Sequence, residues 1–345
     1  MCAVYAFPCA NFSHIKWNEF LSVLIVVVAC SFAVLRSNHG LSPVFYLFST
    51  LSAFYAAKHF NESSIKEVSR CLKVVFWMAI FAIGYILMSY WDHPEPFGEV
   101  IPGSSTNGIP SYLVVLQIAL SLAIFLESKK LPVWSPIFTL VVAVFGLGRG
   151  SIVVAGMILF SSILINFSLK EMTIITRFSI ISNCVLVIFL TLVVFGYYFD
   201  NGPFLDNLID QSKFSEGLLD PYRWQIFDEY LNKLDYLSFL FGSDYSGTVI
   251  VSRYEGNPHI SYIRTHAFFG LFGLLFVVSS PLLIIMSNKK LLYKVVFLYF
   301  VLLALIRALS EPLFFPTLLD FLYFLYFFMF FKYSPIRALK KHLEA

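Results

Sequence analysis

Charged residues are scarce in this chain. Asp, Glu, Lys and Arg make up only 13% of its 345 residues, whereas they make up about 25% of a typical soluble domain. The five cysteines form no CxxC pair, and their odd number argues against a disulfide framework. Nor do His, Cys, Asp and Glu recur at the spacings of metal ligands. The sequence therefore predicts no soluble domain, no disulfide-stapled fold, no metal site and no cofactor.

Apolar residues are abundant instead. The chain is 59% hydrophobic and contains 39 Phe, and several of its uncharged runs reach the ~20 residues that a helix needs to cross a bilayer. We therefore expect an all-α polytopic membrane protein with about 10 transmembrane helices. The predicted spans are roughly residues 17–36, 41–57, 72–91, 109–126, 131–147, 151–168, 176–198, 260–286, 291–308 and 313–331.

The distribution of basic residues predicts the orientation. With the N-terminus inside, most of the 24 Lys and Arg fall in segments on the cytoplasmic side, as the positive-inside rule requires of short loops. Both termini are then cytoplasmic. The chain divides into seven transmembrane helices in residues 1–198, a large outer loop at 199–259, and three further helices with a basic cytoplasmic tail at 260–345.

The large outer loop is predicted to contain structure of its own. Residues 199–259 are too long for a simple connection, and long loops of this kind are usually functional. Within them, the stretch DPYRWQIFDEYLNKL begins with Asp and Pro, which are favourable N-cap and first-turn residues. Apolar residues then recur at helical spacing, at Phe227, Tyr230, Leu231 and Leu234. We predict an amphipathic helix that lies on the outer surface.

The stretch GNPHISYIRTHAFFGLFGLLF places titratable side chains where the eighth span begins. Asn257 and Pro258 predict the start of the helix, and the free N–H groups of such an end attract phosphate and other anions. His259 is then expected in the first turn, with His266 on the same face. Arg264 is directed towards a different neighbour.

A second segment also places a cationic side chain where a predicted span begins on the outer side. FGLGRGSIVVAG, residues 145–156, places an Arg between two glycines at the outward start of the sixth span. Glycine lets a backbone approach a ligand closely, and a guanidinium matches the oxygens of a phosphate. The predicted topology puts further cations on the same membrane face. Together they predict a diphosphate-binding site formed by Arg149, Arg223, Arg264 and Arg307.

Each of these residues can also have a purely structural role. A single outer Arg can contact lipid headgroups, His259 can be a capping group, and His266 can be a packing histidine. Arg307 and Glu311 are four residues apart near a helix end, which is typical of a structural ion pair. Asp320 lies near the middle of the tenth predicted span, where an acid is either functional or hydrogen-bonded to a neighbouring helix.

These segments resemble a known group, the bacterial Wzy-type O-antigen and capsular polysaccharide polymerases and the related O-antigen ligases. The likeness rests on the turn at Arg149 and Gly150, on YRWQIFDEYL with the later LSFLFGSDYSG, and on NPHISYIRTHAFFGLFG. It covers about residues 140–285. Ile260 departs from the family, which often has Asn after this His, and the outer loop holds fewer Arg than the loops of some polymerases.

The resemblance implies an activity. A Wzy-type polymerase transfers a growing glycan from undecaprenyl diphosphate to another lipid-linked repeat unit on the outer face of the bacterial inner membrane. His259 would then orient the acceptor hydroxyl or accept its proton, and Arg149 would stabilise the diphosphate leaving group together with the other arginines. No metal is implied. The implied partners are undecaprenyl-diphosphate-linked oligosaccharide as donor and acceptor, membrane lipids and, as a further candidate, a chain-length regulator, with no nucleic acid.

Three other functions compete with this one. An O-antigen ligase would move the finished glycan onto lipid A–core by the same chemistry, and the sequence separates it poorly from a polymerase. A transporter or flippase for lipid-linked sugars would break its helices and place polar groups near the bilayer midplane, where the sequence offers little beyond Gln117, Asn183 and Asp320. A pure assembly protein could use the same cations to bind headgroups.

Overall fold

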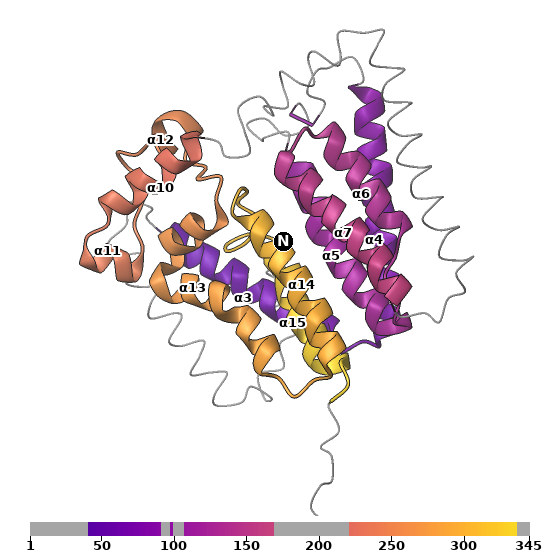
Figure 1. Ribbon diagram of the computed structural model, residues 1–345. Coiled ribbons are helices and arrows are strands. Elements are labelled where there is room, and N and C mark those ends of the chain that lie inside the picture. Colours follow the sequence, from indigo (N-terminus) through magenta and orange to yellow (C-terminus); the bar gives the residue numbers. More distant parts are fainter. Residues whose placement is uncertain (1–40, 91–96, 99–106, 169–220, 337–345) are drawn as a thin grey trace, which may run out of the picture. The chain divides into compact units, whose positions relative to one another are not determined.

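The computed structural model describes residues 41–90, 97–98, 107–168 and 221–336 of the chain (Figure 1). Two predicted spans, 17–36 and 176–198, and the first part of the large loop lie outside these residues. The described residues form helices and no strand beyond an isolated bridge between Lys289 and Ile336. The helices are α3 (Ser42–Phe60), α4 (Ile65–Ser89), α5 (Gly108–Ser128), α6 (Trp134–Phe145), α7 (Arg149–Ser168), α10 (Pro221–Lys233), α11 (Tyr236–Phe241), α12 (Val249–Tyr254), α13 (Ser261–Met286), α14 (Leu291–Ala308) and α15 (Asp320–Tyr333).

Five of the described helices are long and apolar enough to cross a membrane, namely α4, α5, α7, α13 and α14. The expectation of an all-helical membrane protein is thus supported. The helices α3, α6 and α15 coincide with other predicted spans but are not in this class, and α6 has only 12 residues. The predicted total of about 10 spans therefore stays a prediction, since each span needs ~20 residues.

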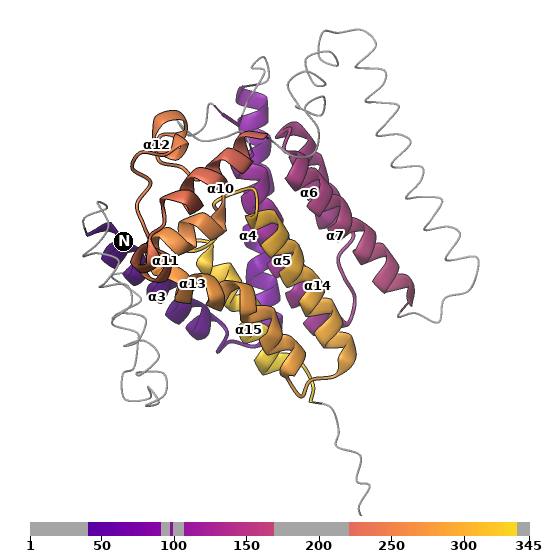
Figure 2. The ribbon, with the colours of Figure 1, turned by 60° about the vertical axis from the view of Figure 1, so that its left-hand side comes forward.

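The chain divides into two units, each built from segments that are distant in the sequence. The described part of the first unit comprises residues 41–79, 111–127 and 221–336, and the second comprises residues 80–110 and 128–168 with the gaps given above. In the first unit α15 packs against α3 and α14, and α13 packs against α3 and α14 (Figures 1 and 2).

One end of the first unit is basic. Lys332 donates hydrogen bonds from its Nζ to the carbonyl oxygens of Asn61 (2.5 Å) and Glu62 (2.9 Å), just after α3 ends. Lys289 donates in the same way to the carbonyls of Phe331 and Ser334 (both 2.7 Å) at the end of α15. A cation at a helix C-terminus satisfies free carbonyls and opposes the negative end of the helix dipole. These lysines belong to segments that the sequence assigns to the cytoplasmic side.

The opposite end contains a buried segment that is not helical. Residues 309–319 connect α14 to α15, and most of their side chains from residue 311 to residue 316 are buried. Ser261, the first residue of α13, accepts hydrogen bonds from the backbone N–H groups of Leu313 (2.7 Å) and Phe314 (3.2 Å) and donates to the carbonyl of Glu311 (2.7 Å). Its hydroxyl thus contributes hydrogen bonds to three backbone groups of a segment that is buried away from water, two of which, the N–H of Leu313 and the carbonyl of Glu311, also bond to each other (2.9 Å).

Asp320 forms hydrogen bonds with the second half of the segment 309–319. Its carboxylate accepts hydrogen bonds from the backbone N–H groups of Phe315 (2.7 Å) and Thr317 (3.2 Å) and from the hydroxyl of Thr50 on α3 (2.7 Å). Asp320 is fully buried and is the first residue of α15. The expectation that it lies near the middle of a span at 313–331 is therefore wrong, because the chain is not helical before residue 320.

The second unit pairs α6 with α7. Asn166 near the end of α7 forms two hydrogen bonds with Leu131, accepting from its N–H and donating to its carbonyl oxygen, both at 2.8 Å. At the other end, Gly148 lies in the tight turn between the helices, and a Cβ there would require the side chain of Asn107 to move. The turn places Arg149 at the first position of α7, as the sequence predicts.

We predict that replacing Asp320 destabilises the protein. Asp320→Ala leaves the buried N–H groups of Phe315 and Thr317 without their acceptor, and an unsatisfied buried group costs about 1–3 kcal/mol. The free energy of unfolding in detergent should fall by roughly 3 kcal/mol, with a smaller loss for Asp320→Asn, which keeps one carbonyl oxygen. The control is Leu318→Ala at an exposed neighbouring position. Equal stability of Asp320→Ala and this control would contradict the assigned role.

Candidate functional site

The predicted loop helix exists and begins at the predicted residue, Pro221. Its buried face consists of Ile226 and Tyr230, and Phe227 and Leu234 pack beside them. Leu231, which the spacing places on the same face, is 54% exposed, so that part of the prediction is wrong. The buried cluster is completed by residues of the following loop, α12 and the start of α13, which are Tyr245, Val249, Ile250, Ile260, Ile263 and Ala267. The apolar face of α10 is thus covered by protein.

His266 joins the loop helices to α13. Its Nε2 lies 2.8 Å from the carbonyl oxygen of Phe239, which can only accept, so this nitrogen carries a proton. Its Nδ1 lies 2.8 Å from the hydroxyl of Tyr230. Burial raises the pKa of Tyr230 well above its ordinary value, so the hydroxyl stays protonated and can donate to a neutral imidazole. This geometry agrees with the interpretation of His266 as a packing residue.

His259 lies before the helix and not in its first turn. The N-cap residue of α13 is Ile260, and the side chain of Asn257 accepts a hydrogen bond from the backbone N–H of His259 (3.0 Å). Asn257 therefore forms a local turn in place of the predicted cap. His259 has a φ of 52°, which is uncommon outside glycine, and its ring meets that of Tyr254 edge to face at 4.9 Å.

The guanidinium of Arg264 lies beside an aromatic ring. Among the described residues its guanidinium forms no ion pair or hydrogen bond, and it lies 5.8 Å from the ring centroid of Tyr46 on α3. The side chain is half-buried. Burial raises the pKa of the neighbouring Tyr245, and the positive charge of Arg264 partly offsets that rise. Arg264 is thus a cation close to Tyr46 and Tyr245 at the start of α13.

Arg307, in contrast, already has its partners. Its side chain is 2% exposed and forms an ion pair with Glu311, whose carboxylate oxygen lies 3.4 Å away. The guanidinium also donates hydrogen bonds to the hydroxyls of Ser111 and Ser310, both at 2.5 Å. The ion-pair interpretation of Arg307 and Glu311 is therefore confirmed. A diphosphate would have to displace these contacts in order to bind Arg307.

The remaining two arginines of the predicted set are described separately. Arg149 belongs to the second unit, where it is half-buried at the start of α7. In the part of the chain that the structure describes, its Nη1 is buried and has no hydrogen-bond partner. A buried guanidinium nitrogen without a partner is costly and is therefore a position where an anion would be stabilised. Arg223 lies in the first turn of α10, and its side chain is outside the described residues.

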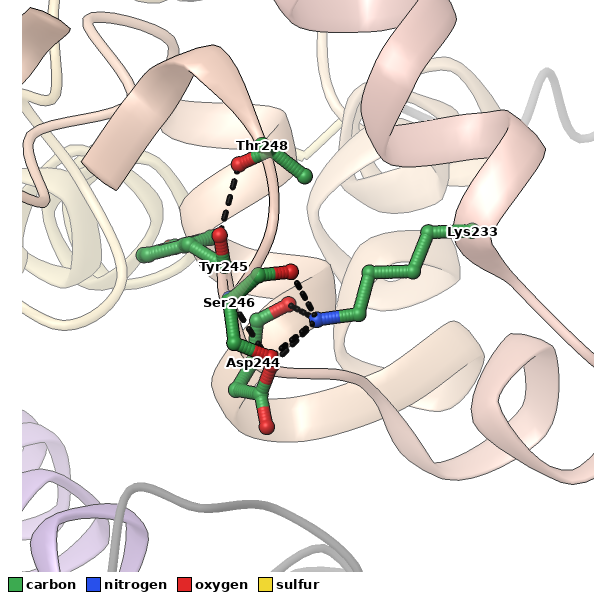
Figure 3. Close-up of polar contacts among 5 residues, drawn as sticks. All are labelled: Lys233, Asp244, Tyr245, Ser246 and Thr248. Atoms are coloured by element: carbon green, nitrogen blue, oxygen red, sulfur yellow. Dashed lines mark hydrogen bonds and ion pairs between the residues drawn. The ribbon is translucent and has the colours of Figure 1, made fainter. Parts of the chain in front are cut away.

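Sequence reasoning missed a cluster of hydrogen bonds around Lys233 at the end of α10, which we call the knot of Lys233 and Asp244 (Figure 3). The Nζ of Lys233 forms an ion pair with the carboxylate of Asp244 and donates to the backbone carbonyls of Asp244 (3.0 Å) and Ser246 (2.8 Å) and to the hydroxyl of Ser246 (2.9 Å). The Asp-Tyr-Ser-Gly sequence at residues 244–247 is typical of tight turns, and a turn that brings Asp244 back to the end of α10 could have been predicted from it. No group of His, Cys, Asp and Glu in the described residues could hold a metal.

We predict that the bond between Tyr230 and His266 stabilises the packing of the loop against α13. Tyr230→Phe removes the hydroxyl that donates to Nδ1 and should lower the free energy of unfolding by about 1 kcal/mol. Proteolysis within residues 221–260 in detergent should also become faster. The matched control is Tyr236→Phe, since Tyr236 is 77% exposed. If the two variants behaved alike, the hydrogen bond would not hold the loop.

No known protein family, no curated protein and no solved structure matches the chain. A proposal about its function rests on the geometry of Arg264, Arg149 and His259 and on the resemblance of the sequence.

Proposed function

We propose that this protein is a membrane glycosyltransferase that polymerises undecaprenyl-diphosphate-linked repeat units into O-antigen or capsular polysaccharide. The reaction takes place on the outer face of the bacterial inner membrane. The observation that carries the proposal is the half-buried guanidinium of Arg264, which has no ion pair or hydrogen bond among the described residues. A diphosphate group provides the negative charge and the acceptors that such a guanidinium lacks.

The chemistry assigns a role to each residue. The acceptor hydroxyl attacks the anomeric carbon of the donor glycan, a new glycosidic bond forms, and the bond to undecaprenyl diphosphate breaks. Arg264 stabilises the negative charge that the diphosphate gains as it leaves, and the sequence assigns the same role to Arg149. His259 orients the acceptor hydroxyl or accepts its proton. Arg307 contributes indirectly, because its ion pair with Glu311 holds the segment against which α13 begins.

A ligase that transfers the finished glycan to lipid A–core would use the same residues and differs only in its acceptor. No contact in the described residues favours one acceptor over the other. The resemblance of the sequence favours the polymerase.

A transporter for lipid-linked oligosaccharides is favoured by a different observation. The backbone of α13 is not helical at Gly270, where φ is 64° and ψ is −166°, and residues 309–319 are irregular and largely buried. Interrupted helices of this kind form binding sites in many secondary transporters. A transporter would carry the lipid-linked sugar across the membrane without forming a glycosidic bond.

We predict that the purified protein in lipid vesicles extends undecaprenyl-diphosphate-linked repeat units into a ladder of longer glycans. Arg264→Ala and Arg149→Ala should each slow this reaction by about 10- to 1000-fold, because each removes a donor to the leaving group. His259→Ala should slow it by about 100-fold or more. The products are separated by size after incubation with the repeat unit alone.

The control for this experiment is Arg253→Ala, which removes an exposed cation of the same loop. It should leave the ladder unchanged. A ladder of equal length from Arg264→Ala would contradict the assigned site. If wild-type protein forms no ladder but moves the lipid-linked repeat unit across the vesicle membrane, the protein is a transporter, and product formed only with lipid A–core identifies a ligase.

A further inference from the structure

A short loop in the first unit has a polar base and an apolar tip. Residues 234–243 leave the end of α10, form α11 and return to the turn at Asp244 (Figure 1). Five of the six residues of α11, in the sequence YLSFLF, are apolar or aromatic, and none of the six is buried. Tyr236 is 77% exposed, and Leu237 and Phe239 are 45% and 47% exposed. We call residues 234–243 the tip loop.

The base of the tip loop is closed by the knot of Lys233 and Asp244 (Figure 3). One ammonium group binds oxygens from both Asp244 and Ser246, so the two ends of the loop are held together. At the first turn of α11, the carboxylate of Asp235 accepts a hydrogen bond from the backbone N–H of Ser238 (2.7 Å). The charge of Asp235 thus lies directly before α11, and the six residues of α11 carry none.

The tip loop is fixed to α13 by two contacts between backbones. A Cβ at Gly242 would collide with the carbonyl oxygens of His266 and Ala267, and a Cβ at Gly270 would collide with the backbone of Leu240 and Phe241. Both glycines have a positive φ. α11 therefore lies directly against the part of α13 where the helix is interrupted, as both ribbon views show (Figures 1 and 2).

The length of α13 indicates how deep in the membrane α11 contacts it. Its 26 residues would extend ~39 Å, which is longer than the ~30 Å of a hydrocarbon core. The apolar stretch after the interruption, residues 271–286, extends ~24 Å. A hydrocarbon core of ~30 Å that begins at the end of α13 would therefore extend ~6 Å past this stretch, to the level of Gly270 and of the tip loop packed against it. Phe272, Leu275 and Phe276 in this stretch of α13 are about half exposed, so the helix that the tip loop packs against also presents apolar side chains at its surface.

We propose that the tip loop inserts into the lipid bilayer beside α13, with Tyr236, Leu237 and Phe239 among the acyl chains just below the headgroups. Lipid acyl chains thus cover the exposed face of α11. Exposed apolar side chains are stable in this position and not in water, tyrosine is favoured at the interface, and the knot of Lys233 and Asp244 remains at headgroup level. The insertion fixes α10 and the start of α13 relative to the membrane surface, whichever reaction the protein performs.

The test uses the full chain with its five cysteines replaced by serine, with a single cysteine introduced at Leu237 or at Phe239. Each variant carries an environment-sensitive fluorophore and is reconstituted in phosphatidylcholine vesicles. The quenchers are lipids with a nitroxide near the headgroup or near the end of the acyl chain, and iodide in the buffer. The matched control has its cysteine at Asp228, an exposed position on α10.

Labels at residues 237 and 239 should be quenched several-fold more by the shallow nitroxide lipid than the label at residue 228, and iodide should quench them several-fold less. Quenching by iodide at all three positions would place the tip loop in water and overturn the proposal. Protection from iodide and from both nitroxide lipids would also overturn it, because another segment or a second copy of the chain would then cover α11. Neither result depends on glycosyltransferase activity.

Discussion

The arrangement of the first unit depends on supplying hydrogen-bond partners to a backbone segment that is buried without being helical. Residues 309–319 cannot bond to themselves as a helix does, and lipid offers them nothing. Ser261 and Asp320 accept hydrogen bonds from four of its backbone N–H groups, Ser261 also donates to the carbonyl of Glu311, and Thr265 adds a contact of 3.2 Å to the carbonyl of Phe315. Because an unsatisfied buried group costs about 1–3 kcal/mol, these side chains determine where the segment lies.

The same contacts fix the rotation of α13. Ser261 and Thr265 are four residues apart and lie on one face of the helix, which must therefore face residues 309–319. Arg264 is adjacent to Thr265 in sequence and points about 100° away around the axis. That direction leads to Tyr46 on α3, where the guanidinium is found. The orientation of the candidate cation thus follows from two hydroxyl residues that contact no substrate.

Hydropathy predicted the positions of long helices well and the irregular segments poorly. The helix predicted at 291–308 is confirmed, and α13 begins one residue after the predicted start of its span, because the length of an apolar run is a local property of the sequence. The run LFFPTLL before Asp320 is as apolar as a membrane-spanning helix, so its hydropathy predicts part of the tenth span. Part of its backbone is instead bonded to Ser261 and Thr265, which are far away in the sequence. No local pattern reveals these bonds, although the proline was a signal.

The same limit applies to the candidate site. Arg264 and Arg307 are equivalent as outer cations in the sequence, but only Arg307 has an acid one turn away, and its bond to Ser111 spans most of the chain. Among the described residues Arg264 has no ion pair or hydrogen bond, and such a cation would be costly in hydrocarbon. In the proposed insertion of the tip loop, the interruption at Gly270 lies near the edge of the hydrocarbon, and Arg264 is on the headgroup side of it. A cation in that position can meet the phosphate of a lipid-linked substrate without entering the membrane core.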